Sequence, residues 1–165
     1  MNAQPIRVRF GTAKNGWLPV LISTFDSKIE YAASYVPKDI VLSLTEVLLE
    51  IAESHTAISR SVVLFHEPAE SEIHFIWSGP ISDSLSLQVL EFPDHLRTKG
   101  PGQAQLSFQN KRGAILLSFW RALRDLESRV EQESFETQWR HTFPSKELSL
   151  LTSAIDAIQH GSGAA

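Results

Sequence analysis

The chain has 165 residues, of which 42% are hydrophobic and 21% are charged, as is typical of a globular domain with one core. Its formal net charge of −4 argues against general binding to nucleic acids or anionic membranes, because both require a basic surface. The chain has no cysteine, which excludes disulfides, thiolate nucleophiles and cysteine-ligated metal centres.

The amino-terminal segment MNAQPIRVRF alternates apolar and charged residues and so lacks the continuous apolar stretch of a signal peptide. No apolar run approaches the roughly 20 residues that cross a bilayer. We therefore expect a soluble, cytoplasmic protein with no membrane partner. Residues 1–160 are predicted to form one domain, and residues 161–165, GSGAA, a disordered tail.

The first part of the chain is predicted to form a three-stranded meander over residues 6–12, 17–25 and 28–36. Alternating apolar residues indicate a half-buried first strand, and Asn15-Gly16 favours a hairpin turn because both residues tolerate a positive φ. Pro19 lacks a backbone donor, so its part of the second strand should lie at an edge or bulge. Asp39 is placed to cap a helix that reaches about Ser54.

The second part predicts four strands over residues 60–66, 71–78, 85–92 and 104–110, followed by helices. From Gly113 the apolar residues take a helical period, and whether this helix continues to Trp139 stays open. Ser145 can begin a last helix, and Gly161 can end it. The predicted fold is α+β: an antiparallel sheet of about seven strands (three-strand meander, helix, four strands) covered by two C-terminal helices.

The segment FHEPAESEIHF, residues 65–75, combines two histidines with three glutamates. A hairpin that pairs residue 66 with residue 73 places Val62 opposite Trp77 and Leu64 opposite Phe75, which gives one coherent core face. His66 and His74 then lie on opposite faces and cannot share a metal ion. A slip of one residue would bring them together but would turn one strand's apolar set outward. The prediction is a hairpin with an acidic tip and no metal site.

Other polar segments carry weaker signals. The segment RTKGPGQ lacks the spacing of a P-loop and is predicted to be a mobile connection, and no Gly-x-Ser-x-Gly turn accompanies the Asp94-His95 pair. The cluster Trp139, Arg140 and His141 is the most suggestive candidate for binding a small ligand. The alternative is that Trp139 anchors the last helix in the core. No catalytic residue, metal or cofactor is predicted, and whether the protein is an enzyme stays open, with the balance against it.

An acidic, cysteine-free domain with this order of elements resembles bacterial immunity proteins of polymorphic toxin systems. It is also similar to uncharacterised bacterial families with a W…FP…EL segment, which here comprises Trp139, Phe143-Pro144 and Glu147-Leu148. The resemblance concerns the layout of most of the chain, and no functional residue carries over. It implies a cytoplasmic protein that binds and neutralises a toxin domain without catalysis.

Three hypotheses follow: a protein-binding module of the immunity type, a homodimeric adaptor that pairs through a sheet edge or helix face, and a ligand-binding protein that uses Trp139, Arg140 and His141. For the first hypothesis, a nuclease-like toxin would present a cationic site that binds nucleic-acid phosphate. Acidic side chains would complement that site. The predicted partner-binding residues are Glu67, Glu70, Glu72, Glu91 and Asp94.

Overall fold

The computed structural model describes residues 5–131 and 134–161. The predicted α+β class is confirmed, and the strands of the described residues divide into two antiparallel sheets, ordered β1-β2-β3 and β4-β5-β6-β7. In chain order the elements are β1 (Arg7–Phe10), β2 (Trp17–Ser23), β3 (Lys28–Ser34), α1 (Ile40–Glu53), β4 (Ile58–His66), β5 (Ala69–Trp77), β6 (Ser84–Phe92), β7 (Gln103–Lys111), α2 (Arg112–Arg129), α3 (Phe135–Trp139) and α4 (Ser145–Gly161).

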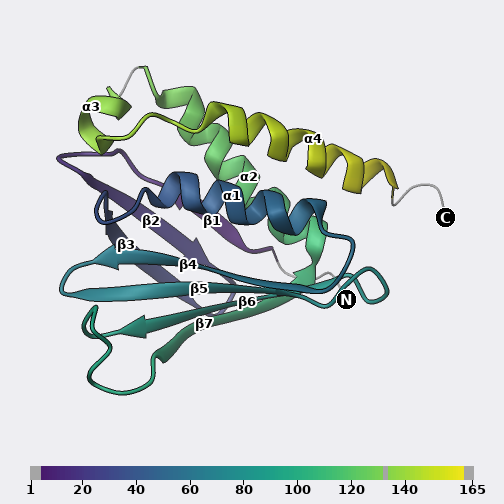
Figure 1. The fold of residues 1–165 in the computed structure, drawn as a ribbon, viewed down its shortest axis with the longest axis horizontal. Helices are drawn as coiled ribbons and strands as arrows, with labels where there is room; N and C mark the ends of the chain where they lie inside the picture. The colour runs from purple at the N-terminus through teal and green to yellow at the C-terminus, as the bar shows by residue number, and fades with distance from the viewer. Residues whose placement is uncertain (1–4, 132–133, 162–165) are drawn as a thin grey trace.

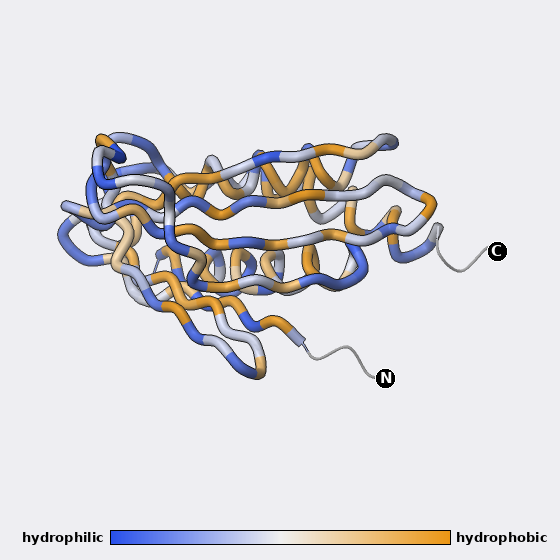
Figure 2. Tube along the Cα trace, turned by 90° about the horizontal axis from the view of Figure 1, so that it is seen from below, coloured by the Kyte–Doolittle hydropathy of each residue, from blue (hydrophilic) through white to orange (hydrophobic). Residues whose placement is uncertain are grey.

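The helices lie on one side of the strands (Figure 1). Helix α1 packs against β4 and α4, while α2 packs against β1 and α4 and also contacts β6 and β7. Seen from below, the strands lie in front and the helices behind them (Figure 2). The four-stranded sheet therefore has an inner face toward the helices and an outer face that the described helices leave uncovered. In the described residues, the helices lack the combination of length and apolar character needed to cross a bilayer.

One hydrophobic core joins both sheets to the helices. Phe75 of β5 meets Phe119 of α2 edge-to-face, with ring centroids 5.4 Å apart. The prediction that the strand residues and the α2 stripe share a core is confirmed, since the following side chains are all buried in it: Val62, Leu64, Phe75, Trp77, Leu116, Phe119, Leu123 and Leu126.

The predicted register of the β4–β5 hairpin is wrong by four residues. Val62 pairs with Ile73 and Leu64 with Ser71, and the turn contains only residues 67 and 68. Strand β5 begins at Ala69, two residues before the predicted strand of residues 71–78. Because the error is an even number of residues, every side chain keeps its predicted face.

Local signals account for several turns and caps. Asn15 and Gly16 have φ values of 53° and 81°, as the predicted turn requires, and the Asp39 carboxylate accepts hydrogen bonds from the backbone N–H groups of Val41 and Leu42. Strand β2 is central in its sheet, so the edge position predicted for Pro19 is wrong for the strand. Pro19 nevertheless lies just beyond the β1 pairing, which ends at residues 10 and 20.

The helical C-terminal part contains a break that the sequence left open. Helix α2 ends at Arg129, and the short helix α3 precedes α4, which begins at Ser145 as predicted and ends at Gly161. Apart from Gly161, the predicted tail lies outside the described residues.

Candidate functional site

The carboxylates of Glu70 and Glu72 lie on the outer face of the four-stranded sheet, beside the hairpin turn, and share one cation. Arg97 reaches them from the connection between β6 and β7. Its Nε donates to Glu70 Oε1 at 2.6 Å, and its Nη2 lies 2.7 Å from Glu72 Oε2. The guanidinium also stacks on Phe92, 4.0 Å from the ring centroid. The two glutamate side chains are only 5% and 12% exposed, so they do not form the solvated acidic tip that the sequence suggested.

The charges in this cluster stabilise one another. Hydrogen bonding to Glu70 is the largest of the effects that raise the pKa of Arg97 above its usual value. Burial by itself raises the pKa of Glu72, but hydrogen bonds from Ser61 and Arg97 and the charges of His74 and Arg97 outweigh burial. The pKa of Glu72 is therefore lowered overall, and its carboxylate stays ionised in its largely buried position.

The connection that carries Arg97 is ordered by its own contacts. The Asp94 carboxylate accepts from the backbone N–H groups of Leu96 at 3.0 Å and Thr98 at 3.2 Å, and from the Thr98 hydroxyl. The hydrogen bond from the Thr98 backbone is the main reason that the pKa of Asp94 is lowered. At the other end, a Cβ on Gly102 would stand 2.6 Å from Phe92 Cζ, so this approach to the sheet requires glycine. The connection is therefore held by the contacts of Asp94 and of Arg97.

A hollow of about 660 Å³ lies beside the turn of the β4–β5 hairpin, lined by Pro37, Phe65, Glu67, Pro68, Ala69 and His95. Leu96 extends from the adjoining connection and is 71% exposed. We call the hollow, together with Asp94 and Leu96, the hairpin-end surface. It combines an apolar floor with carboxylates at Glu67 and Asp94, which suits contact with another macromolecule.

The inner face at this end carries a partly buried polar network around the buried Ser71 hydroxyl. His66 Nε2 and Ser71 Oγ are 2.8 Å apart, and the His66 ring stacks on Tyr31 with centroids 4.4 Å apart. Glu91, which pairs with Ser71 across the strands, hydrogen bonds with Tyr31. Burial lowers the pKa of His66 and, as the largest effect, raises the pKa of Tyr31 to about 12.

A serine within hydrogen-bond distance of a histidine is the geometry of a nucleophile and its base. Ser71, however, is fully buried, so a substrate carbonyl has no access to its hydroxyl. The pair instead joins β5 to β3 through Tyr31. His74 lies on the outer face, so the predicted placement of the two imidazoles on opposite faces is confirmed. No group of three or more possible metal ligands occurs among the described histidines and carboxylates.

The Trp139-Arg140-His141 cluster attaches α3 to the start of α1. Trp139 is fully buried, and its Nε1 donates to the Asp39 carboxylate at 2.9 Å. His141 Nε2 lies 2.8 Å from the Tyr35 carbonyl oxygen, and the Arg140 guanidinium lies over the Tyr35 ring at 5.6 Å. The predicted ligand-binding residues are therefore engaged with the protein itself, and the two larger cavities are lined by other residues.

The five predicted partner-binding carboxylates are not gathered on one surface. Glu67 and Asp94 belong to the hairpin-end surface, Glu70 and Glu72 are held by Arg97, and Glu91 faces Tyr31 inside. Sequence reasoning missed Arg97. One signal could have indicated it: Glu70 and Glu72 stand two residues apart, which puts both on one face of a strand, where paired carboxylates require a cation.

Comparisons with known proteins add no functional assignment. No protein-family model matches the chain, and neither the curated proteins nor the solved structures gave a match. The chemistry of the chain's own residues is therefore the basis for proposing a function.

Proposed function

We propose that the protein is a non-enzymatic, protein-binding module. In its sharpest form, it is a cytoplasmic immunity protein that neutralises a toxin domain. The hairpin-end surface is the observation that carries this proposal. Its apolar hollow suits an apolar or aromatic anchor side chain of a partner, and Glu67 and Asp94 suit basic groups around that anchor.

The order in the β6–β7 connection supports a binding role. Long connections that carry exposed residues normally lose conformational entropy when a partner immobilises them. Here Arg97 and Asp94 hold the connection before any partner arrives, and Leu96 is presented on a fixed backbone. Binding at this surface would therefore require little further ordering.

Two polar clusters could suggest catalysis or ligand binding, but their reactive groups are not available, which favours a protein-binding role. The hydroxyl of Ser71 is buried, and the indole N–H of Trp139 is used by Asp39. Each cluster connects secondary-structure elements and is explained by that role alone. A nuclease-like toxin suits the remaining carboxylates, because its cationic site would meet Glu67 and Asp94.

The first test is binding to the product of an adjacent toxin gene, measured with the purified protein. Leu96→Asp places a charge on the exposed leucine of the hairpin-end surface, and Ile81→Asp is the matched control on a fully exposed isoleucine at the opposite end of the sheet. We expect Leu96→Asp to weaken binding about tenfold or more, because central apolar contacts dominate interface affinity. Equal affinities for the two variants, or failure of the wild-type protein to bind, would contradict the proposal.

A homodimer is a second candidate, and strand β7 favours it. Its nine residues pair with β6 on one side only, so one row of backbone groups is unpaired within the sheet. Lys111 is the only charged residue of β7, so two antiparallel copies could pair without opposing like charges. Mass measurement in solution tests this candidate: a monomer at high concentration contradicts it, and a dimer disrupted by Ser107→Lys supports it.

A further inference from the structure

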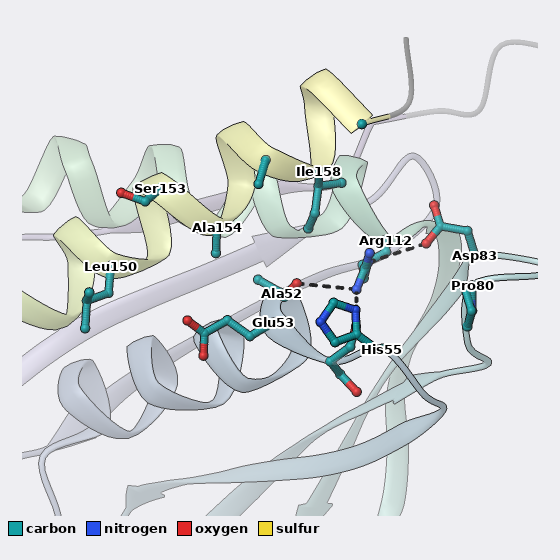
Figure 3. Close-up of a pocket in the computed structure, with 13 residues that line it drawn as sticks. Ala52, Glu53, His55, Pro80, Asp83, Arg112, Leu150, Ser153, Ala154 and Ile158 are labelled. Carbon is teal, nitrogen blue, oxygen red and sulfur yellow. Dashed lines mark hydrogen bonds and ion pairs between the residues drawn. The ribbon is translucent and has the colours of Figure 1, made fainter. Parts of the chain in front are cut away.

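A second cavity, of about 850 Å³, lies at the other end of the molecule (Figure 3). It is bounded by the last turn of α1, the turn at Pro80 and Asp83, the first residue of α2, and the second half of α4. It shares no lining residue with the hairpin-end surface. We call it the Arg112 groove, after the cation that lines it.

Arg112 caps the C-terminal end of α1. Its Nη1 donates to the carbonyl oxygens of Ile51 at 3.2 Å, Ala52 at 3.4 Å and Ser54 at 3.0 Å. These carbonyls belong to the helix end, where backbone acceptors have no partner within the helix. The guanidinium also stacks on Trp77, 4.0 Å from the ring centroid. Arg112 is therefore held in a fixed orientation by the fold.

The hydrogen-bonding capacity of Arg112 is only partly used. Its Nε is buried without a hydrogen bond, and the nearest carboxylate oxygen, Asp83 Oδ1, lies 3.5 Å away and accepts from Trp77 Nε1. Nη2 makes no hydrogen bond with the described residues. Burial lowers the pKa of Arg112, and the charge of Asp83 opposes this effect. The cation is thus desolvated and incompletely neutralised, a state that an additional anion would stabilise.

The opposite wall of the groove is an apolar strip on α4. Leu150, Ala154, Ala157 and Ile158 recur at helical spacing, and the two alanines leave room beside the helix axis. From residue 150 to residue 158 the helix rises about 12 Å. In Figure 3, Ile158 lies near Arg112 and Leu150 lies at the far end of the strip. The Glu53 carboxylate also lies away from Arg112, toward Leu150.

We propose that the Arg112 groove binds a small carboxylic acid with an apolar chain. The carboxylate accepts a charge-assisted hydrogen bond from Arg112 Nη2, and the chain lies along the apolar strip of α4. The groove volume falls in the range of small-molecule sites, about 300–1,000 Å³. Because Arg112 is already oriented by three carbonyls and Trp77, binding does not have to order the cation.

Calorimetric titration of the purified protein with decanoate, below its micelle concentration, tests this proposal. Decan-1-ol and decyltrimethylammonium are the comparison ligands, since they keep the chain and replace the anionic group. We expect one decanoate per chain, with the alcohol about tenfold weaker or more and the cation weaker still, because only the anion pairs with Arg112. Absence of decanoate binding, or an alcohol that binds as tightly, overturns the proposal.

Three substitutions test where decanoate binds. Ala157→Trp fills the groove without removing any contact of Arg112, and Gln159→Trp places the same ring on an exposed position of α4 that does not line it. We expect loss of decanoate binding only in Ala157→Trp. Arg112→Lys keeps the charge without the planar fork, and a folded Arg112→Lys should bind decanoate about tenfold more weakly. Equal binding by both tryptophan variants would overturn the assignment, whatever the stability of Arg112→Lys.

Discussion

The two ends of the four-stranded sheet each contain an arginine stacked on an aromatic ring, and the two arginines differ in how far they are neutralised. Arg97 lies over Phe92 and Arg112 over Trp77, both at 4.0 Å. Arg97 is 38% exposed, yet it is paired with two carboxylates at 2.6 and 2.7 Å. Arg112 is 14% exposed, and its nearest carboxylate oxygen lies at 3.5 Å.

In these two arginines, the degree of burial and the degree of charge pairing do not go together. Arg97 is the more exposed of the two, yet its charge is paired with two carboxylates. It therefore serves to attach the β6–β7 connection to the sheet. The more buried arginine uses neutral carbonyls as its main acceptors and keeps charge available for a ligand. A cation's exposed fraction alone therefore does not indicate whether it can bind an anion; its partners must be identified first.

The largest expected effect is that of removing Arg97. Arg97→Met leaves the largely buried carboxylates of Glu70 and Glu72 without a cation, and we expect a loss of about 3 kcal/mol in the free energy of unfolding at neutral pH. That value is at the low end for buried pairs because Arg97 is partly exposed. Urea unfolding monitored by tryptophan fluorescence measures it.

The destabilisation caused by Arg97→Met should become smaller as the pH falls. The pKa of Glu72 is lowered in the folded protein, so its contribution to stability is complete above the unfolded-state pKa and is lost as the pH falls. Wild type and Arg97→Met should therefore start to converge as the pH falls through the unfolded-state pKa of about 4.3, and should continue to converge below it. Adding Glu70→Gln and Glu72→Gln to Arg97→Met should restore part of the stability at neutral pH. A loss that stays constant with pH would show that Arg97 acts through packing alone.

Removing Arg112 should have a slightly smaller effect with a different pH profile. Arg112→Met leaves three carbonyl oxygens of α1 without their donor, and we expect a loss of about 2 kcal/mol. Carbonyl groups do not titrate, so this loss should persist in acid, where the Arg97→Met loss fades. Unfolding of both variants across the same pH series makes the comparison. If the two losses fade together, Asp83 rather than the carbonyls is the main partner of Arg112.

The elements of this fold could be predicted from the sequence because their signals are local. Asn15-Gly16 and Asp39 act within a few residues of themselves, and the apolar periods of the strands and helices are read from neighbouring positions. The hairpin register failed because it depended on how many residues the turn contains. Residues 69 and 70 look like part of the loop by composition, yet they pair with His66 and Phe65, and Arg97 balances the carboxylate of Glu70 there.

The candidate sites could not be predicted because their residues are far apart in the sequence. Arg97 is separated from Glu70 by 27 residues, and Arg112 is separated from the Ile51 carbonyl by 61. No period or short motif connects such positions. Trp139, Arg140 and His141 were conspicuous because they are adjacent in sequence, but each of them is used by the fold.

His66, on the inner face at the hairpin end, should make the free energy of unfolding depend on pH by about 1 kcal/mol. Burial lowers the pKa of His66 below its unfolded-state value of about 6.5, so the unfolded chain takes up a proton first as the pH falls. Stability from the neutral ring is complete above that value and declines below it. His66→Gln should reduce the decrease in Tm between about pH 7.5 and about pH 5.5. His55→Gln, at an exposed histidine, is the matched control, and an unchanged decrease in His66→Gln would assign it to other groups.

The smallest expected effect concerns the carboxylates that no arginine neutralises. If the hairpin-end surface binds a basic partner, Glu67 should steer the encounter more than Glu70 or Glu72, because Arg97 already balances those two. Glu67→Gln should lower the association rate about two- to threefold at low salt, and the difference should vanish at high salt. Leu96→Asp should act mainly through faster dissociation, since Leu96 would supply an apolar contact and no steering charge. Stopped-flow or surface-binding kinetics at both salt concentrations separate the two rates. An association rate that Glu67→Gln leaves unchanged at low salt would show that the surface binds through its apolar hollow without electrostatic steering by this residue.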